Sequence, residues 1–243
     1  MLLYLSILLF PLISSLLVSF AGKYFNKLNV IIISISSMGI CLICSLIVFW
    51  KVALLRAPYF FYLFPWIHSG LFVVDWDFRF DVVTVTMLLV VNIVSFLVHL
   101  YSVNYMGEDP YLFRFLSYIS LFTFFMVVLV TSNNFIQLFL GWEGVGLCSF
   151  LLISFWFTRI QAVKSALKAF IINRIGDLGL TLGIILLFKV SCSLDFETIF
   201  SLAPYLTNKN LVFCTFNFNA LNAICFLLFI GAIGKSAQIG LHL

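Results

Sequence analysis

Seven apolar stretches, each long enough to cross a lipid bilayer as a helix, follow one another along the 243-residue chain. A helix needs about 20 mostly apolar residues to span the hydrocarbon core of a membrane. The pattern therefore predicts an all-α polytopic membrane protein with about seven transmembrane helices. The stretches cover residues 3–20, 30–50, 82–101, 115–131, 135–157, 166–190 and 219–243. Glycines surround Lys235 in the last stretch, so we expect the seventh helix to be broken or incomplete.

Two segments between these helices are predicted to lie at the membrane surface. Residues 58–81 alternate apolar and polar positions near their end, as a strand does, and predict a surface hairpin. Residues 193–204 predict a short interfacial helix that starts after Ser193 and ends before Pro204. We therefore expect two parts: residues 1–110, with the first three helices and the hairpin, and residues 111–243, with helices four to seven.

The composition supports the membrane class and narrows the chemistry. Hydrophobic residues make up 64% of the chain and charged residues 9%, against about half and a quarter in a soluble domain. The net charge of +4 forms no basic cluster of the kind that binds nucleic acid. Cys41 and Cys44 lie in an apolar run without histidine or acidic neighbours, which favours packing over a metal or redox site. Because nucleotide-binding, iron–sulfur and haem motifs are absent, we expect no cofactor and no metal in this chain.

Four formal charges lie well inside the apolar stretches: Glu143, Arg174, Asp177 and Lys235. An ionisable group at bilayer depth is costly unless it is paired or hydrated, so such residues are functional candidates by default. Glu143 has no charged partner on its own helix, and its charge state should respond to nearby charges. It is therefore a candidate proton site. Two alternatives remain: Arg174 and Asp177, three residues apart, form an intrahelical pair, or Lys235 extends to the headgroups.

Depth along the helices suggests which of these charges lie at one level. Measured from the membrane face that the segments share, Glu143 is about 12 Å deep, Lys235 about 21 Å and Asp177 about 20 Å, at 1.5 Å per residue. Lys235 is thus predicted beside Asp177, with the Glu143 backbone more than about 10 Å away once a helix spacing is added. We expect Glu143 and Lys235 to be coupled through water or a third group. Gly141, Gly144 and Gly146 near Glu143 allow close helix packing or leave room for water.

Other candidates carry weaker signals. Lys164 and Lys168, four residues apart where the sixth stretch begins, mark a basic membrane face or deliver protons to the interior. His99 favours a packing or hydrogen-bonding role, and His68 belongs to the surface segment. His242, one residue from the end of the sequence, is a further candidate whose setting depends on any continuation of the chain.

Several long motifs resemble one protein family. "FLGWEGVGLCSFLLISFWFTR", "NRIGDLGL" and "GAIGKSAQIGLH", together with "HLYSVNYMGEDP" and "RFLSYISLFTFFM", are similar to the subunit 5 family of mitochondrial NADH:ubiquinone oxidoreductase, respiratory complex I. The similarity extends over essentially the whole chain. It implies an antiporter-like, proton-pumping subunit at the distal end of the membrane arm, in which residues 111–243 form an incomplete first repeat.

The resemblance also implies roles for the four charges. The glutamate of the G-W-E-G motif and the lysine of G-K-S-A-Q are the family's pumping pair, which correspond to Glu143 and Lys235. The aspartate and arginine of R-I-G-D correspond to Asp177 and Arg174 and would tune that pair. Electrons would pass elsewhere, because the FMN, iron–sulfur clusters and ubiquinone of such a complex bind outside this chain. Other membrane-arm subunits and lipids, cardiolipin among them, would be partners in the mitochondrial inner membrane.

The frequent Phe, Ile and Asn suggest AT-rich coding, and hence an organelle genome. The family continues well past the histidine that corresponds to His242, so the sequence suggests a split subunit that a second chain completes after Leu243, or a truncated product. Two other functions stay open: a subunit of a multi-subunit sodium/proton antiporter, and an architectural remnant retained for assembly.

Overall fold

A computed structural model describes residues 1–207, 209–213 and 216–242. In these residues, six helices are long and apolar enough to cross a membrane, and the chain is a multi-pass membrane protein. They are α1 (Leu2–Ala21), α2 (Lys27–Phe49), α3 (Val82–Tyr105), α4 (Leu112–Thr131), α5 (Phe135–Ile153) and α6 (Ile160–Ser191), and a π-helical turn, Trp50–Leu54, extends α2. Two shorter helices follow, α7 (Phe196–Leu206) and the apolar α8 (Ala220–Lys235).

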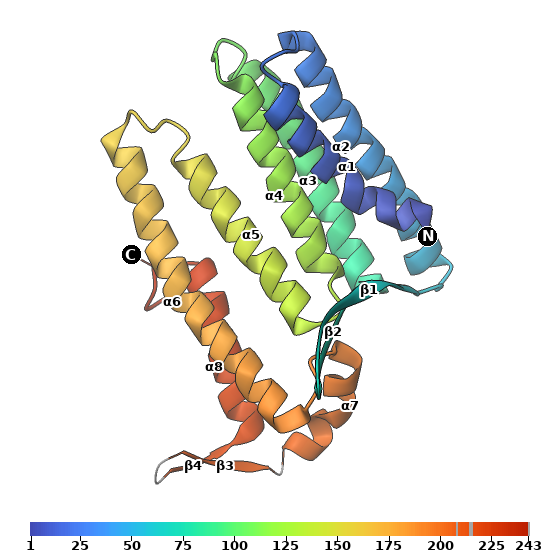
Figure 1. Cartoon of the computed structure of the whole chain (residues 1–243), viewed down its shortest axis with the longest axis vertical. Helices are drawn as coiled ribbons and strands as arrows, with labels where there is room; N and C mark the ends of the chain where they lie inside the picture. The colour runs from blue at the N-terminus through green and yellow to red at the C-terminus, as the bar shows by residue number, and fades with distance from the viewer. Residues whose placement is uncertain (208, 214–215, 243) are drawn as a thin grey trace.

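The helices form two groups joined by α5 (Figure 1). α1 to α4 pack on one another as a bundle, α5 packs on α4, and α6 packs on α5 on one side and closely on α8. The bundle has an apolar core whose fully buried side chains include Ile7, Val85 and Leu88. α4 thus contacts both α1 and α5, and a boundary at residue 110 divides helices that are in contact.

An antiparallel hairpin lies across one end of the bundle, where the sequence predicts a surface hairpin. β1 (Tyr59–Ser69) pairs with β2 (Phe72–Phe80), with Tyr59 opposite Phe80 and Ser69 opposite Phe72. The inward side chains of both strands, Phe61, Phe78 and Phe80, are buried in the bundle core. The hairpin is therefore part of the packed structure and closes that end of the bundle.

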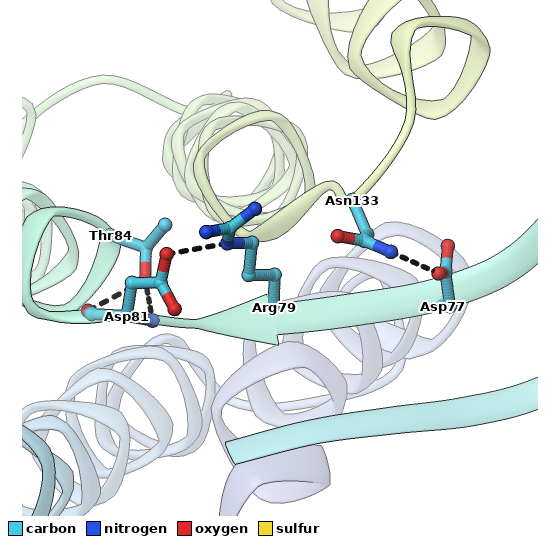
Figure 2. Close-up of polar contacts among 5 residues, drawn as sticks. All are labelled: Asp77, Arg79, Asp81, Thr84 and Asn133. Carbon is cyan, nitrogen blue, oxygen red and sulfur yellow. Dashed lines mark hydrogen bonds and ion pairs between the residues drawn. The ribbon is translucent and has the colours of Figure 1, made fainter. Parts of the chain in front are cut away.

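Polar contacts fix the hairpin to α3 and to the segment between α4 and α5 (Figure 2). Arg79 Nε donates to Asp81 Oδ2, and the Asp81 backbone N–H donates to Thr84 Oγ1 (2.7 Å) at the start of α3. Asp77 accepts hydrogen bonds from the side-chain amides of Asn133 and Asn134. Burial, reinforced by the nearby Asp195 and Asp75 carboxylates, nevertheless raises the pKa of Asp77.

Two details of the segment between α6 and α8 differ from the sequence prediction. α7 runs through Pro204 to Leu206 instead of ending before the proline. This is possible because Pro204 lies in the last turn, and the carbonyl that it leaves unpaired belongs to the exposed Phe200. A second hairpin, β3 (Asn210–Phe213) with β4 (Phe216–Asn219), follows α7 and was not predicted.

The predicted seventh helix is short. α8 has 16 residues and ends at Lys235, where the chain turns. Its first turn is capped by the Asn219 side chain, which accepts from the Leu221 backbone N–H at 3.0 Å. Lys235 is therefore the last helical residue of a helix that ends inside the apolar stretch, in agreement with a broken or incomplete seventh helix.

Candidate functional site

The site begins with α5, which carries Glu143. The helix starts at an N-cap, Asn134, whose Oδ1 accepts from the Gln137 backbone N–H (2.7 Å), and it contains no proline. Two of its glycines allow it to lie close to α4. A Cβ at Gly141 would come within 2.8 Å of the Leu129 backbone, and one at Gly144 within 2.2 Å of the Phe125 ring. Close packing is therefore what Gly141 and Gly144 provide.

Glu143 forms an ion pair with α6. Arg174 Nη1 lies 2.7 Å from Glu143 Oε1 and 2.7 Å from Oε2. The Arg174 guanidinium also packs over the Phe170 ring, 5.0 Å from its centroid. The pair is partly accessible, with 49% of the Arg174 side chain and 23% of the Glu143 side chain exposed. The carboxylate thus has a cation on a neighbouring helix, which the sequence prediction did not assign to it.

A face of glycines brings α8 against α6 and sets the height of Lys235. A Cβ at Gly234 would lie 2.9 Å from the Gly176 Cα, and a Cβ at Gly231 would lie 2.9 Å from the Leu180 Cβ. Side chains at these positions would hold the two backbones apart. Because Gly234 lies against Gly176, the next residues in the two helices, Lys235 and Asp177, are at one level, as the sequence predicts.

Trp142 connects the remaining charges. Its indole Nε1 donates to Asp177 Oδ1 at 2.6 Å. Lys235 Nζ lies 4.3 Å from the centroid of the Trp142 ring and donates to the Trp142 backbone carbonyl. A Cβ at Gly146, one turn further along α5, would lie at an ordinary contact distance of 3.8 Å from Lys235 Nζ, so the ammonium lies beside this glycine. One residue of α5 therefore binds a carboxylate of α6 and an ammonium of α8.

This geometry changes two expectations. Arg174 and Asp177 make no ion pair with each other among the described residues, because Arg174 binds Glu143 and Asp177 binds Trp142.

Lys235 is also close to α5, although its predicted depth placed it away from Glu143. The depth estimate assumed that the segments share one membrane face, but the last turns of α6 and the first turns of α8 extend past the N-terminal end of α5 (Figure 1). The last residue of α8 therefore lies beside the first half of α5. In the described part of the chain Glu143 and Lys235 make no direct ion pair, as predicted.

The weaker candidates lie elsewhere. Lys164 and Lys168 are exposed near the start of α6, and His242 is exposed near the end of the described chain. Their roles in proton transfer stay predictions. His99 is fully buried in the bundle, where Nδ1 donates to the Ser95 carbonyl (2.8 Å) and Nε2 lies 3.1 Å from Ser120 Oγ of α4. His68 pairs with Asp75 across the first hairpin at 2.7 Å.

The sequence interpretation missed Trp142 as a site residue. It lies within the quoted G-W-E-G motif, directly before Glu143. The available signal was the indole N–H, which needs an acceptor when it is removed from water. In the part of the chain that the structure describes, no three His, Cys, Asp or Glu side chains gather in a way that could hold a metal ion. The arrangement is one of fixed charges and hydrogen bonds, which suits the storage and transfer of protons.

Comparison with known proteins identifies similar sequences. Residues 132–243 match the family described as "NADH:quinone oxidoreductase/Mrp antiporter, TM", and residues 66–116 match "NADH-Ubiquinone oxidoreductase (complex I), chain 5 N-terminus". Proteins named NADH-ubiquinone oxidoreductase chain 5 are 52% identical over 241 residues in Marchantia polymorpha and 51% identical over 239 in Arabidopsis thaliana. Each alignment covers 98% of this chain and 36% of the relative. The chain thus spans about a third of the length of these relatives.

A solved structure shares the fold. A chain of the membrane-bound sulfane sulfur reductase, an archaeal respiratory membrane complex, superposes with a TM-score of 0.79 at 15% sequence identity. The match covers 95% of this chain and 44% of the archaeal one. At this identity the likeness concerns the fold alone.

Proposed function

We propose that this chain, which belongs to the NADH-ubiquinone oxidoreductase chain 5 family, forms part of a proton-translocating subunit of NADH:ubiquinone oxidoreductase. The observation that carries the proposal is the set of four charges held between α5, α6 and α8. The Glu143 carboxylate is paired with Arg174 on another helix, and the Lys235 ammonium lies near this pair without joining it. The proton occupancy of the carboxylate can therefore change when either cation moves. Quinone reduction elsewhere in the complex would supply the free energy.

In the proposed mechanism, Glu143 takes up and releases the translocated proton. Arg174 stabilises the ionised form of Glu143 at 2.7 Å. A movement of Lys235 toward or away from Glu143 changes the proton affinity of the carboxyl group. At about 7 Å and an effective dielectric constant of about 20, one unit charge acts on another by roughly 2–3 kcal/mol. Such an energy changes an equilibrium roughly 30- to 160-fold, which is sufficient to load or empty the site.

The surroundings of the subunit are part of the proposal. Its partners would be other membrane-arm subunits, lipids such as cardiolipin, and a second chain that supplies the remaining length of the chain 5 relatives. Its location would be the mitochondrial inner membrane, with an organelle gene encoding it. FMN, iron–sulfur clusters and ubiquinone would bind to other subunits. Mass spectrometry of the purified complex tests the partners, since the proposal requires this chain to co-purify with flavin and iron–sulfur subunits.

Substitution of Glu143 by glutamine tests the function. The amide keeps the size of the side chain and cannot take up the translocated proton. In the assembled complex in sealed membranes, we expect NADH-driven proton translocation to be abolished or strongly reduced, while NADH oxidation by an artificial acceptor is retained. The matched control is Glu108→Gln, the same change between α3 and α4, away from the charged site. Normal translocation by an assembled Glu143→Gln complex would contradict the proposal.

A second candidate function is suggested by the description of the family that matches residues 132–243, which also includes Mrp antiporters. A cation/proton antiporter would use the same charged site without a redox partner. The two functions differ in their driving force. Proton movement that depends on NADH and quinone supports the oxidoreductase, whereas movement driven by a sodium gradient alone supports the antiporter.

A further inference from the structure

The two opposite charges that lie at one level, Lys235 and Asp177, are both bound to Trp142 and not to each other. Trp142 Nε1 donates to Asp177 Oδ1 at 2.6 Å, at the edge of the indole. Lys235 Nζ lies over the face of the same indole, 4.3 Å from its centroid. No ion pair joins Lys235 to an acidic side chain among the described residues, although the glycine packing of α6 on α8 brings it to the level of Asp177.

Such an arrangement needs an explanation, because opposite charges attract strongly in an apolar environment. An ammonium and a carboxylate on neighbouring helices would normally form a direct ion pair. The indole offers each of them a substitute: an N–H donor for the carboxylate, and a π-face with a backbone carbonyl for the ammonium. Both substitutes belong to one residue of α5, whose position is fixed by the packing of Gly141 and Gly144 on α4.

We propose that Trp142 is a positioning residue that separates Lys235 from Asp177 and so keeps the ammonium free to act on Glu143. This inference rests on the proposed function. Trp142 binds no proton itself. Its N–H satisfies the Asp177 carboxylate, while its ring face and backbone carbonyl hold the Lys235 ammonium. These contacts prevent a Lys235–Asp177 ion pair, in which the ammonium would hold its proton tightly and no longer respond to the adjacent carboxyl group.

The charged and titratable groups around Lys235 are few. Glu143 lies on α5, Arg174 and Asp177 lie on α6, and Lys235 itself ends α8. α4, which packs on the other side of α5, contributes no Asp, Glu, Lys or His between residues 115 and 131. A change in the pH dependence of translocation after substitution of Trp142 can therefore be assigned to these four groups.

The test is Trp142→Phe in the assembled complex, which keeps an aromatic face and removes the N–H donor. Asp177 then lacks its hydrogen bond and attracts Lys235. Because the paired ammonium holds its proton more tightly, the alkaline limb of the pH profile of proton translocation should move to higher pH. We expect a shift of about one pH unit, equivalent to a tenfold change in proton affinity, the size expected for one hydrogen bond to a charged group. Trp156→Phe is the matched control, since its indole donates to Asp109 in a surface loop.

A second substitution separates positioning from general damage to the structure. In an Asp177→Asn background the carboxylate that would capture Lys235 is absent and Glu143 stays paired with Arg174, so adding Trp142→Phe should leave the alkaline limb unmoved. An equal shift in both backgrounds would overturn the proposal, as would an unmoved limb in Trp142→Phe alone. If Trp142→Phe does not assemble, Trp142→His replaces it, because the imidazole provides an N–H donor for Asp177. The alkaline limb of the pH profile should then stay in place. A shift of this limb by about one pH unit overturns the proposal.

Glu143→Gln is measured in the same membranes. If Glu143→Gln translocates protons normally, the proposed function fails. If Glu143→Gln is inactive and Trp142→Phe has the unchanged profile of the Trp156→Phe control, only the role of Trp142 fails.

Discussion

The bundle of α1 to α4 and the group of α5, α6 and α8 bury polar groups in opposite ways. In the bundle, the buried polar side chains are serines, threonines, Asn92 and His99, and the formal charges lie only near helix ends. Most of the hydroxyls donate to a carbonyl of their own helix, as Thr131 does to Val127 at 2.7 Å. The other group carries Glu143, Arg174 and Asp177 in the middle of α5 and α6. These side chains are bound across helices, as is Lys235 at the end of α8.

The difference indicates that the polar groups of α1 to α4 have a structural role, whereas the charges of α5, α6 and α8 have a chemical one. Neutral polar groups with local hydrogen bonds cost little in an apolar core and keep helices in register. Charges cost more and are retained where they can change partners. We therefore expect substitutions in the bundle to change stability alone, and substitutions in the group of α5, α6 and α8 to change proton translocation.

The largest effect should come from the contact that sets the height of Lys235. Gly234→Ala places a Cβ 2.9 Å from the Gly176 Cα, where only backbone movement can relieve the overlap. We expect a loss of about 2–3 kcal/mol of stability, seen as reduced assembly in native gels, with reduced translocation. Gly39→Ala in α2 is the control, because its Cβ would meet only a side-chain atom at 3.5 Å. Equal assembly of both variants would contradict this role of the glycine face.

A smaller effect is expected when Glu143 loses its cation. Arg174→Gln removes the ion pair while retaining a polar side chain, so ionisation of Glu143 becomes less favourable. We expect translocation at neutral pH to fall about tenfold, since the pair is partly exposed and partly screened. Arg159→Gln at the start of α6 is the matched control. A variant at Arg174 with full activity would show that Lys235 alone controls Glu143.

The third effect tests the bundle. His99→Gln removes the imidazole that links Ser95 of α3 to Ser120 of α4. We expect a loss of about 1–2 kcal/mol of stability, measured as a lower thermal midpoint in detergent, with unchanged translocation per NADH oxidised. His68→Gln, at an exposed position of the first hairpin, provides the comparison. A specific loss of translocation in His99→Gln would place a functional group in the bundle and break the division between the two regions.

The smallest effect concerns pH at the hairpin. The pKa of Asp77 is raised by burial and by Asp195 and Asp75, so the folded state holds this proton more tightly than the unfolded chain. Stability should therefore fall as pH rises from the unfolded pKa, about 3.9, through the raised pKa of the folded state. We expect a difference of about 0.5 kcal/mol or less that Asp77→Asn removes and Asp109→Asn does not. An unchanged pH slope in Asp77→Asn would assign the dependence to another group.

Much of the fold could be predicted from the sequence. The first six apolar stretches coincide with α1 to α6 to within a few residues at most ends, because the need to satisfy backbone groups in lipid favours helices. The predicted end of α7 was wrong, since a proline in a last turn leaves only one carbonyl unpaired and water can satisfy it. The second hairpin was missed because each of its strands has only four residues: β4 alternates as FNFN, but β3, NLVF, does not alternate.

The sequence predicted which charged residues form the site, but not which contacts they make. An intramembrane charge is visible in a sequence, and so Glu143, Arg174, Asp177 and Lys235 were identified. Their partners depend on the axial offset between neighbouring helices. The glycine contacts between α6 and α8 determine that offset for these two helices, and the apolar pattern of the sequence does not predict it. This offset explains why Lys235 reaches Trp142 and why the Arg174–Glu143 pair was not foreseen.

The central claim, that the Glu143 carboxyl group changes its protonation during turnover, can be tested by infrared difference spectroscopy of the complex as it is driven by NADH. The account predicts a carbonyl band of a protonated carboxylic acid that is present in the native protein and in Glu108→Gln and is missing in Glu143→Gln. An unchanged band in Glu143→Gln would contradict it.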